Sequence, residues 1–285
     1  MSSTLLIHQA VLCAYQDLKE VSDKPRSDAQ MLLANILGKT HTWIMTHPEA
    51  ELNFREKEDY FHSLSRYKSG EPLPYVLGWW EFFGRRFNIN ESVLIPRPET
   101  EHIVEHAIRF LLANPSKRSA LDIGTGSGCI AVTLLDEFED LQITATDISY
   151  SALKLARDNA VKFGVESRLR LSQMDLTIAI TGLFDLIFAN LPYIPTASLE
   201  NLKVARNEPL IALNGGEDGL SLIKQLLKDI PRLLVPEGCA LLELEAGTGE
   251  RVLEVARADI AKADFRLIQD LAGHDRVLAI EYDES

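Results

Sequence analysis

The chain has 285 residues, of which 46% are hydrophobic, and at roughly 150 residues per domain this length predicts one large domain and a smaller one. Its formal net charge of −13 argues against a protein that binds nucleic acid broadly through a basic face, although a local basic patch is not excluded. The three scattered cysteines, Cys13, Cys129 and Cys239, form no C-x-x-C pair, so we expect them to be small core residues and not metal ligands. No run reaches about 18 apolar residues, so we expect a cytoplasmic protein without a membrane partner.

Residues 1–72 are expected to form a small helical domain. Apolar residues recur at helical spacing in residues 5–18, and a second helix is predicted over residues 27–37 with Ser27 as its N-cap. A third helix is predicted over residues 55–68. No catalytic or metal-ligating constellation occurs in this stretch, which indicates a role other than chemistry.

Residues 73–98 are expected to form a linker and a β-hairpin. Two prolines in residues 70–75 predict a rigid connector, and the pattern of residues 78–95 predicts a strand, a turn and a strand. A Pro-Arg-Pro segment then fixes an extended loop. Thr100 is expected to cap a helix that ends near residue 113.

Residues 99–285 are expected to form an α/β domain, because strands and helices alternate from Ser119 onward. Strands are predicted near residues 119–123, 142–147, 168–173, 184–190, 239–245, 265–270 and 276–282. Helices are predicted near residues 128–138, 149–163, 218–233 and 248–262. The pattern predicts a seven-stranded, largely parallel sheet with right-handed crossovers. About five residues join the last two strands, which is too short for a parallel crossover, so that pair should be antiparallel.

A glycine-rich loop follows the first predicted strand of this domain. Strand, glycine turn and helix in succession present a helix N-terminus to a ligand in α/β proteins. A dinucleotide fingerprint would need glycine at position 129, and Cys129 stands there. The sequence therefore disfavours a nicotinamide dehydrogenase, and a plain strand-to-helix turn is the alternative to a binding loop. The candidate cofactor-binding residues are Gly124, Thr125, Gly126, Ser127 and Gly128.

An acidic residue ends the next predicted strand, and another follows the strand after it. Asp147 lies about 20 residues beyond the glycine loop, where a carboxylate can bind a pair of ribose hydroxyls. The alternative for Asp147 is an N-cap of the helix that follows. Asp175 and its neighbour Leu176 follow the next strand and are candidates to lie near an adenine, although Asp175 could equally be a turn carboxylate.

The fourth predicted strand ends in the tetrapeptide Asn190-Leu191-Pro192-Tyr193. Ligands of open α/β sheets bind at the carboxyl ends of strands. Pro192 biases Leu191 toward an extended conformation, which would hold the Leu191 carbonyl beside the Asn190 side-chain oxygen. Two adjacent acceptors suit a planar NH₂ group. These four residues are therefore the candidate catalytic residues.

These motifs together resemble the S-adenosylmethionine-dependent methyltransferases with a Rossmann-like fold. The chain more closely resembles the release-factor glutamine methyltransferases of the PrmC or HemK type, along nearly its whole length. The matching segments are Glu71-Pro72 with Tyr75 and Gly78, residues 95–101, residues 122–128, residues 147–149, Ala152-Leu153, Ala156-Arg157, Asn159-Ala160, the tetrapeptide, Glu208-Pro209, Ala212-Leu213, residues 215–220 and residues 273–276. One departure is Leu191, where the family usually has proline, but the backbone carbonyl is kept.

The resemblance implies a role for each candidate residue. The methionine end of S-adenosylmethionine would lie over residues 124–128, with its ribose on Asp147. Asn190 and the Leu191 carbonyl would accept the two N–H bonds of a glutamine side-chain amide, and Tyr193 would pack against that amide or close the pocket. The helical domain and hairpin would dock a peptide chain release factor, whose glutamine lies in a Gly-Gly-Gln loop.

Two other functions stay open from the sequence. The same tetrapeptide chemistry serves the exocyclic amine of adenine, but a DNA or RNA methyltransferase needs base flipping and a basic docking surface, and the acidic balance counts against a nucleic-acid substrate. A module that binds the cofactor without catalysis is the second alternative. Intact Asn190 and Pro192 argue against it, whereas Leu191 keeps it open.

Overall fold

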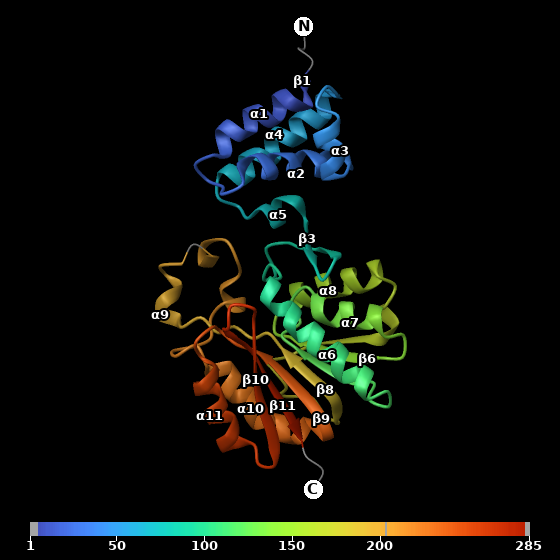
Figure 1. The fold of residues 1–285 in the computed structure, drawn as a ribbon, viewed down its shortest axis with the longest axis vertical. Helices are drawn as coiled ribbons and strands as arrows, with labels where there is room; N and C mark the ends of the chain where they lie inside the picture. The colour runs from blue at the N-terminus through green and yellow to red at the C-terminus, as the bar shows by residue number, and fades with distance from the viewer. Residues whose placement is uncertain (1–4, 203, 283–285) are drawn as a thin grey trace. The chain divides into compact units, whose positions relative to one another are not determined.

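A computed structural model of the chain describes residues 5–202 and 204–282 (Figure 1). The chain divides into two compact units, Met1–Trp79 and Trp80–Ser285. This division falls within the predicted linker of residues 73–98, whereas the outermost predicted domain ends, residues 1 and 285, lie outside the described residues. No helix in the described residues is long and apolar enough to cross a bilayer.

The first unit is helical. Its elements are β1 (Leu5–Leu6), α1 (Ile7–Leu18), α2 (Pro25–Leu37), α3 (His41–Thr46), β2 (Glu51–Leu52), α4 (Phe54–Lys68) and α5 (Leu73–Leu77). Helix α4 begins with a capping box, in which the Asn53 side chain accepts from the Glu56 N–H at 2.9 Å and the Glu56 carboxylate accepts from the Asn53 N–H at 2.8 Å. Tyr60 of α4 is fully buried, and its hydroxyl donates to the Ala29 carbonyl of α2 at 3.2 Å. The three predicted helices are therefore present and packed together.

Three details of this unit differ from the sequence prediction. Helix α2 begins at Pro25 after Lys24, so the predicted N-cap at Ser27 is wrong; proline suits the first turn of a helix because it lacks the N–H that would be unpaired there. Helix α5 occupies part of the predicted connector. Cys13 is exposed, so the core position predicted for it is wrong, whereas the other two cysteines are buried.

The second unit is built on a seven-stranded sheet with the order β10-β11-β9-β8-β5-β6-β7. Its strands are β5 (Ser119–Ile123), β6 (Gln142–Asp147), β7 (Leu169–Gln173), β8 (Phe184–Ala189), β9 (Leu234–Glu243), β10 (Ala263–Gln269) and β11 (Asp275–Tyr282). Strands β5 to β9 are parallel, and β11 is antiparallel to both β9 and β10. The predicted mixed sheet with an antiparallel last pair is confirmed.

Helices cover both faces of the sheet (Figure 1). Alternate residues such as Ile123, Ile187 and Leu242 pack against α10 (Ser221–Leu233) and α11 (Gly249–Asp259) in one apolar core. The other face carries α6 (Glu101–Ala113), α7 (Cys129–Glu137) and α8 (Tyr150–Lys162). Because strand side chains alternate between faces, Asp122 and Glu243 point toward this second helical layer.

The remaining elements are short. A two-stranded sheet pairs β3 (Trp79–Phe82) with β4 (Arg85–Asn88). The short helices are η1 (Pro98–Thr100), η2 (Glu166–Arg168), α9 (Thr196–Leu199), η3 (Val204–Arg206) and η4 (Leu210–Ala212). The hairpin predicted within residues 78–95 is therefore present.

Strand register brings the predicted site residues together. Ile123 of β5 pairs with Thr146 of β6 on one side and with Ala189 of β8 on the other. The residues that follow these three, Gly124, Asp147 and Asn190, therefore lie at the same edge of the sheet. This edge is formed by the carboxyl ends of parallel strands, where open α/β sheets bind ligands.

Candidate active site

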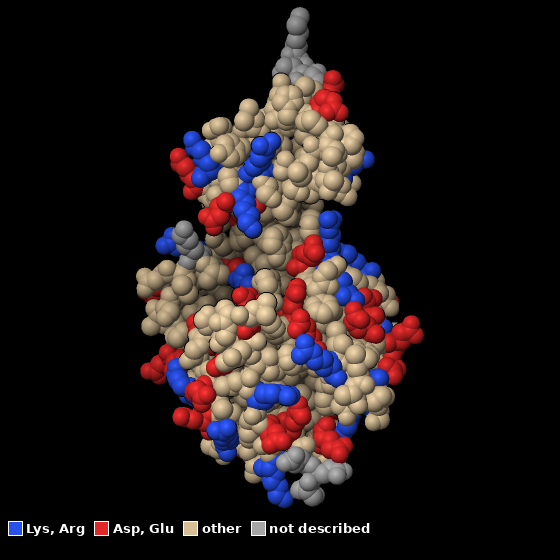
Figure 2. All heavy atoms as spheres, in the orientation of Figure 1, with Lys and Arg blue, Asp and Glu red and all other residues tan. Residues whose placement is uncertain are grey.

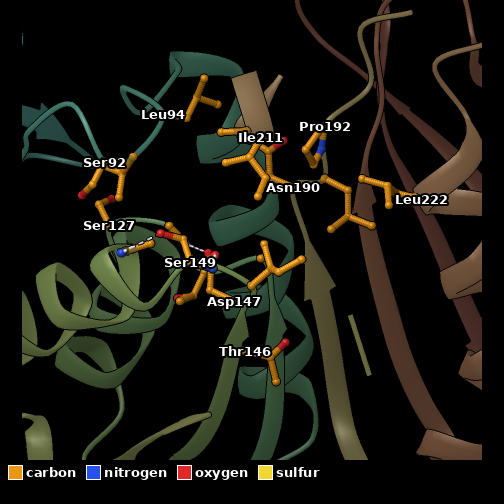
Figure 3. Close-up of a pocket in the computed structure, with 18 of the residues that line it drawn as sticks. Ser92, Leu94, Ser127, Thr146, Asp147, Ser149, Asn190, Pro192, Ile211 and Leu222 are labelled. Carbon is orange, nitrogen blue, oxygen red and sulfur yellow. Dashed lines mark hydrogen bonds between the residues drawn. The ribbon is translucent and has the colours of Figure 1, made fainter. Parts of the chain in front are cut away.

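A pocket of about 430 Å³ lies at this edge of the sheet (Figure 3). Ten of the predicted site residues line it: Gly124, Thr125, Gly126, Ser127, Asp147, Asp175, Leu176, Asn190, Leu191 and Pro192. Gly128 and Tyr193 are not among its lining residues. In Figure 3, Ser127, Asp147 and Ser149 lie on one side of the pocket, and Asn190 and Pro192 at the end of β8 lie on the other.

The glycines of the loop have different roles, since one leaves space for a ligand and another allows two helices to pack closely. Gly124, Gly126 and Gly128 have φ values of 74°, 56° and 77°, which favour glycine. A Cβ on Gly126 would meet no atom within 4 Å, so its backbone is open to a ligand. A Cβ on Gly128 would lie 3.1 Å from the Ala156 Cβ of α8. Gly128 therefore allows α7 and α8 to pack closely and does not border the pocket.

Asp147 links the glycine loop to helix α8. Its Oδ2 accepts from the Gly126 N–H at 2.9 Å, and its Oδ1 accepts from the Ser149 N–H at 2.8 Å. Burial raises the pKa of Asp147, and these backbone donors oppose that shift. The N-cap of α8 is Ser149, whose hydroxyl accepts from the Ala152 N–H at 3.2 Å, so the alternative assignment of Asp147 as that cap is wrong. Each Asp147 oxygen keeps a lone pair for a further donor.

Two buried polar atoms beside the pocket have no partner among the described residues: Asp122 Oδ1 and Ser127 Oγ. The other Asp122 oxygen accepts from the Thr125 hydroxyl at 2.6 Å, and burial raises the pKa of Asp122 to about 7. An unpaired buried polar atom is unfavourable unless a ligand or water completes its hydrogen bonds. Ser127 is one of the residues that line the pocket, and a polar ligand there can complete the hydrogen bonds of its buried hydroxyl.

The buried side chain of Asn159 in α8 supports the glycine loop from behind. Its amide nitrogen donates to the Ser127 carbonyl at 2.8 Å and to the Asn88 carbonyl at 3.1 Å, and its oxygen accepts from the Asn88 N–H at 2.8 Å. One side chain therefore joins β4, α8 and the loop that borders the pocket.

Asn190 is held through its amide nitrogen. Nδ2 donates to the Thr100 hydroxyl at 3.0 Å, so the Oδ1 end of the amide is turned away from Thr100. Thr100 is the N-cap residue of α6, as predicted, but its side chain makes no capping hydrogen bond. The neighbouring Leu191 side chain is buried, and its Cδ2 would lie 3.2 Å from a Cβ on Gly124. Leu191, where the family usually has proline, therefore packs against the glycine loop.

Two segments outside the predicted site residues also contribute to the pocket. Glu208 is buried and accepts from the Ile95 N–H at 3.0 Å and from Arg97 Nη2 at 2.6 Å. This tie joins the loop before α6 to the segment that carries Leu210 and Ile211, which line the pocket although they are 56% and 55% exposed. Glu208-Pro209 is one of the matching motifs, but no local pattern indicates that the apolar residues after it reach the site.

No group of three or more His, Cys, Asp or Glu side chains in the described parts of the chain could hold a metal ion. The polar groups of the pocket are instead carboxylates, hydroxyls, side-chain amides and backbone N–H groups. They suit an organic ligand with hydrogen-bonding groups.

Comparison with known proteins identifies the family. Residues 9–78 match the family described as PrmC N-terminal domain, and residues 101–207 match the one described as Methyltransferase small domain. A methyltransferase from Pyrococcus furiosus shares the fold, with a TM-score of 0.51 and 19% identity over 81% of this chain and 99% of that one.

Curated relatives match over most of their length. The release factor glutamine methyltransferase of Koribacter versatilis is 37% identical over 256 residues, covering 89% of this chain and 90% of that protein. The protein of the same name from Moorella thermoacetica is 38% identical over 256 residues, with the same coverage of 89% and 90%. The chain therefore belongs to the release factor glutamine methyltransferase family.

Proposed function

We propose that this chain uses S-adenosylmethionine to methylate the side-chain amide nitrogen of the glutamine in the Gly-Gly-Gln loop of a peptide chain release factor. The observation that carries the proposal is the orientation of Asn190. Its amide nitrogen is bound to Thr100, so its oxygen is the end available to accept a hydrogen bond from a substrate N–H. This residue lines the pocket on the opposite side from Asp147.

The residues of the pocket fit S-adenosylmethionine. Asp147 has lone pairs left for the ribose hydroxyls, and the unpartnered Ser127 hydroxyl can bind a polar part of the ligand. Ile148, Met174 and Leu176 offer apolar surface to the adenine. When bound, S-adenosylmethionine supplies an electrophilic methyl group on its sulfonium sulfur. Asp175 lines the same region and is exposed to solvent.

Asn190 and Leu191 would activate the acceptor by orienting it. An amide nitrogen is a weak nucleophile because its lone pair is delocalised into the carbonyl. Acceptance of its two N–H bonds by Asn190 Oδ1 and the Leu191 carbonyl would favour a pyramidal nitrogen whose lone pair faces the methyl group. Fixed positioning and preorganised dipoles then supply much of the rate. The amide nitrogen releases one proton to water after transfer, so no strong base is needed beforehand.

Tyr193 is not a base at neutral pH. Burial raises the pKa of Tyr193 to about 12, with the neighbouring Glu243 carboxylate adding to the shift. Its hydroxyl therefore keeps its proton, which supports a packing or closing role in place of proton abstraction.

The helical first domain, predicted as residues 1–72, is proposed to dock the release factor together with the hairpin of residues 73–98. Acidic and basic side chains are interspersed on the face of the second unit drawn in Figure 2, where the coloured residues form no continuous basic surface. This distribution and the net charge of −13 favour a protein substrate over nucleic acid. The cytoplasmic location stays a prediction.

The test is to incubate the protein with methyl-labelled S-adenosylmethionine and either a release factor or a DNA or RNA oligonucleotide. We expect label on the release factor, and none on a matched release factor whose Gly-Gly-Gln glutamine is replaced by alanine. Label on the oligonucleotide alone would instead establish an adenine methyltransferase. Bound cofactor with no labelled product would support a binding module.

A further inference from the structure

A buried carboxylate that the sequence did not single out lies behind Asn190. Glu243 at the end of β9 is 4% exposed, and one of its oxygens, Oε2, is buried without a partner among the described residues. The nearby Thr100 hydroxyl lowers the pKa of Glu243, as a hydrogen-bond donor to the carboxylate does. Thr100 is itself 2% exposed and accepts from Asn190 Nδ2. The three side chains thus form a row from the sheet to the pocket.

We propose that Glu243 is a positioning residue that acts through the Thr100 hydroxyl to fix which end of the Asn190 amide faces the pocket. The inference rests on the proposed function, because it assigns to Asn190 Oδ1 the task of accepting a substrate N–H. Glu243 and Thr100 need no contact with the reacting atoms for this role.

The direction of the hydrogen bonds follows from the chemistry of the three groups. An ionised carboxylate can only accept a hydrogen bond, so in the proposed arrangement Thr100 donates its single proton to Glu243. The Thr100 oxygen is then left as an acceptor, and it can bind only the NH₂ end of Asn190, as observed at 3.0 Å. The Asn190 oxygen is consequently turned toward the pocket, where it can meet the substrate NH₂ group.

Loss of the Glu243 charge would remove this constraint. A protonated carboxyl can donate, so the row can reverse: Glu243 donates to Thr100, and Thr100 donates to Asn190 Oδ1. The Asn190 NH₂ group would then face the substrate NH₂ group, and two donors cannot bind each other. Burial raises the pKa of Glu243 to about 7, so both forms are accessible near neutral pH.

Charged and titratable groups surround Glu243 from several elements. Arg276 of β11 and Arg97 lower its pKa, whereas Glu99 raises it. The charge of Glu243 also helps to raise the pKa of the Tyr193 hydroxyl after β8 and of the Cys129 thiol at the start of α7. The groups that face Glu243 are thus Arg97, Glu99, Cys129, Tyr193 and Arg276. Both arginines remain charged throughout the neutral range. Asp122 beside the glycine loop also has a pKa raised to about 7, so only a pH transition that Glu243→Gln removes belongs to Glu243.

Single-turnover methyl transfer with the full-length protein, saturating S-adenosylmethionine and a release factor tests the proposal. Thr100→Val keeps the shape but removes the hydroxyl, and we expect the rate to fall about tenfold, equivalent to about 1.4 kcal/mol. Cofactor affinity should stay within about threefold, and Thr100→Ser should restore most of the rate. Thr133→Val is the matched control, because Thr133 is a fully buried threonine whose hydroxyl donates to the Cys129 carbonyl within α7.

The pH profile separates orientation from simple packing. The parent rate should fall as the pH drops through about 7, whereas Glu243→Gln cannot titrate at position 243 and should give a slower rate with a smaller change through this pH range. A Thr100→Val rate equal to that of the parent, or an unchanged pH profile in Glu243→Gln, would overturn the proposal.

A measurement without substrate keeps this inference separate from the proposed function. In ¹⁵N-labelled protein, the Asn190 side-chain NH₂ signals, assigned by their loss in Asn190→Ala, should shift and exchange faster with solvent in Thr100→Val. Identical signals in the parent and Thr100→Val would refute the inference even if the release factor is methylated. Failure of the parent to label any release factor would refute the proposed function, while the NH₂ signals would still decide the orientation.

Discussion

Replacement of Asn190 by alanine is the most direct test of the two-acceptor arrangement. The change removes one of two acceptors proposed for the substrate NH₂ group and leaves the backbone of the tetrapeptide intact. Loss of a comparable preorganised hydrogen-bonding group lowers rates by about 100- to 1000-fold, or roughly 3–4 kcal/mol. Asn190 is half-buried, so water can partly replace the lost acceptor, and we expect the lower part of this range, about 100-fold.

The assay is a single-turnover rate with saturating cofactor and a release factor. Cofactor affinity, measured by calorimetry, should be largely kept, since Asp147 and the glycine loop are untouched. The free energy of unfolding should fall by about 1 kcal/mol, because the Thr100 hydroxyl loses the hydrogen bond that Asn190 Nδ2 donates to it. Asn190→Asp keeps an acceptor but adds charge, and it should bind cofactor and transfer poorly. An Asn190→Ala rate within about threefold of the parent, an effect below about 1 kcal/mol, would show that the mechanism is wrong.

Three further predictions concern cofactor binding, the buried carboxyl group of Glu243 and the role of the first domain. Asp147→Ala should bind S-adenosylmethionine at least about tenfold more weakly by calorimetry with the fold intact, and unchanged affinity would remove Asp147 from the site. Burial raises the pKa of Glu243 from 4.5 to about 7, so the stability that Glu243 contributes at low pH is lost as the pH rises to 7. At pH 8 the free energy of unfolding of Glu243→Gln should therefore exceed that of the parent, by up to about 3 kcal/mol. An equal or lower denaturation midpoint at pH 8 would contradict this sign. A chain that begins near residue 72 should, if folded, still bind cofactor but methylate the release factor poorly, and full activity would refute the docking role.

Strands that end at a clear local signal could be predicted to the residue. The bounds of β5 and β6 agree with the prediction, because the glycine loop follows β5 and Asp147 with the start of a helix ends β6. Strand β9 begins at Leu234, five residues before the predicted start at 239. Pro236 and Gly238 read as a turn, but they lie where the pairing with β8 is irregular, and a strand tolerates such residues there.

Contacts between distant segments could not be predicted from the sequence. Thr100 precedes a helix and has the side chain of an N-cap, yet its hydroxyl serves Asn190, which is 90 residues away. Glu243 lies within the apolar run Ala240 to Leu244, and its position there gives no information on the side chain that it meets. The candidate binding residues could be predicted because each lies at or just after a strand end, which is a local signal. Their partners were missed because only the tertiary fold brings them near.

The shared register of β5, β6 and β8 also determines how this chain can change in length. A one-residue insertion or deletion within β8 would send every following side chain of that strand to the opposite face. Asn190 would then no longer lie beside Gly124, and the apolar side chains of β8 would point toward the opposite layer of helices. The segment between α9 and η4 carries no strand pairing in the described residues, so length changes there would leave the register intact. Variation in chain length is therefore expected to accumulate between the strands, and the strand that leads to Asn190 should keep its number of residues.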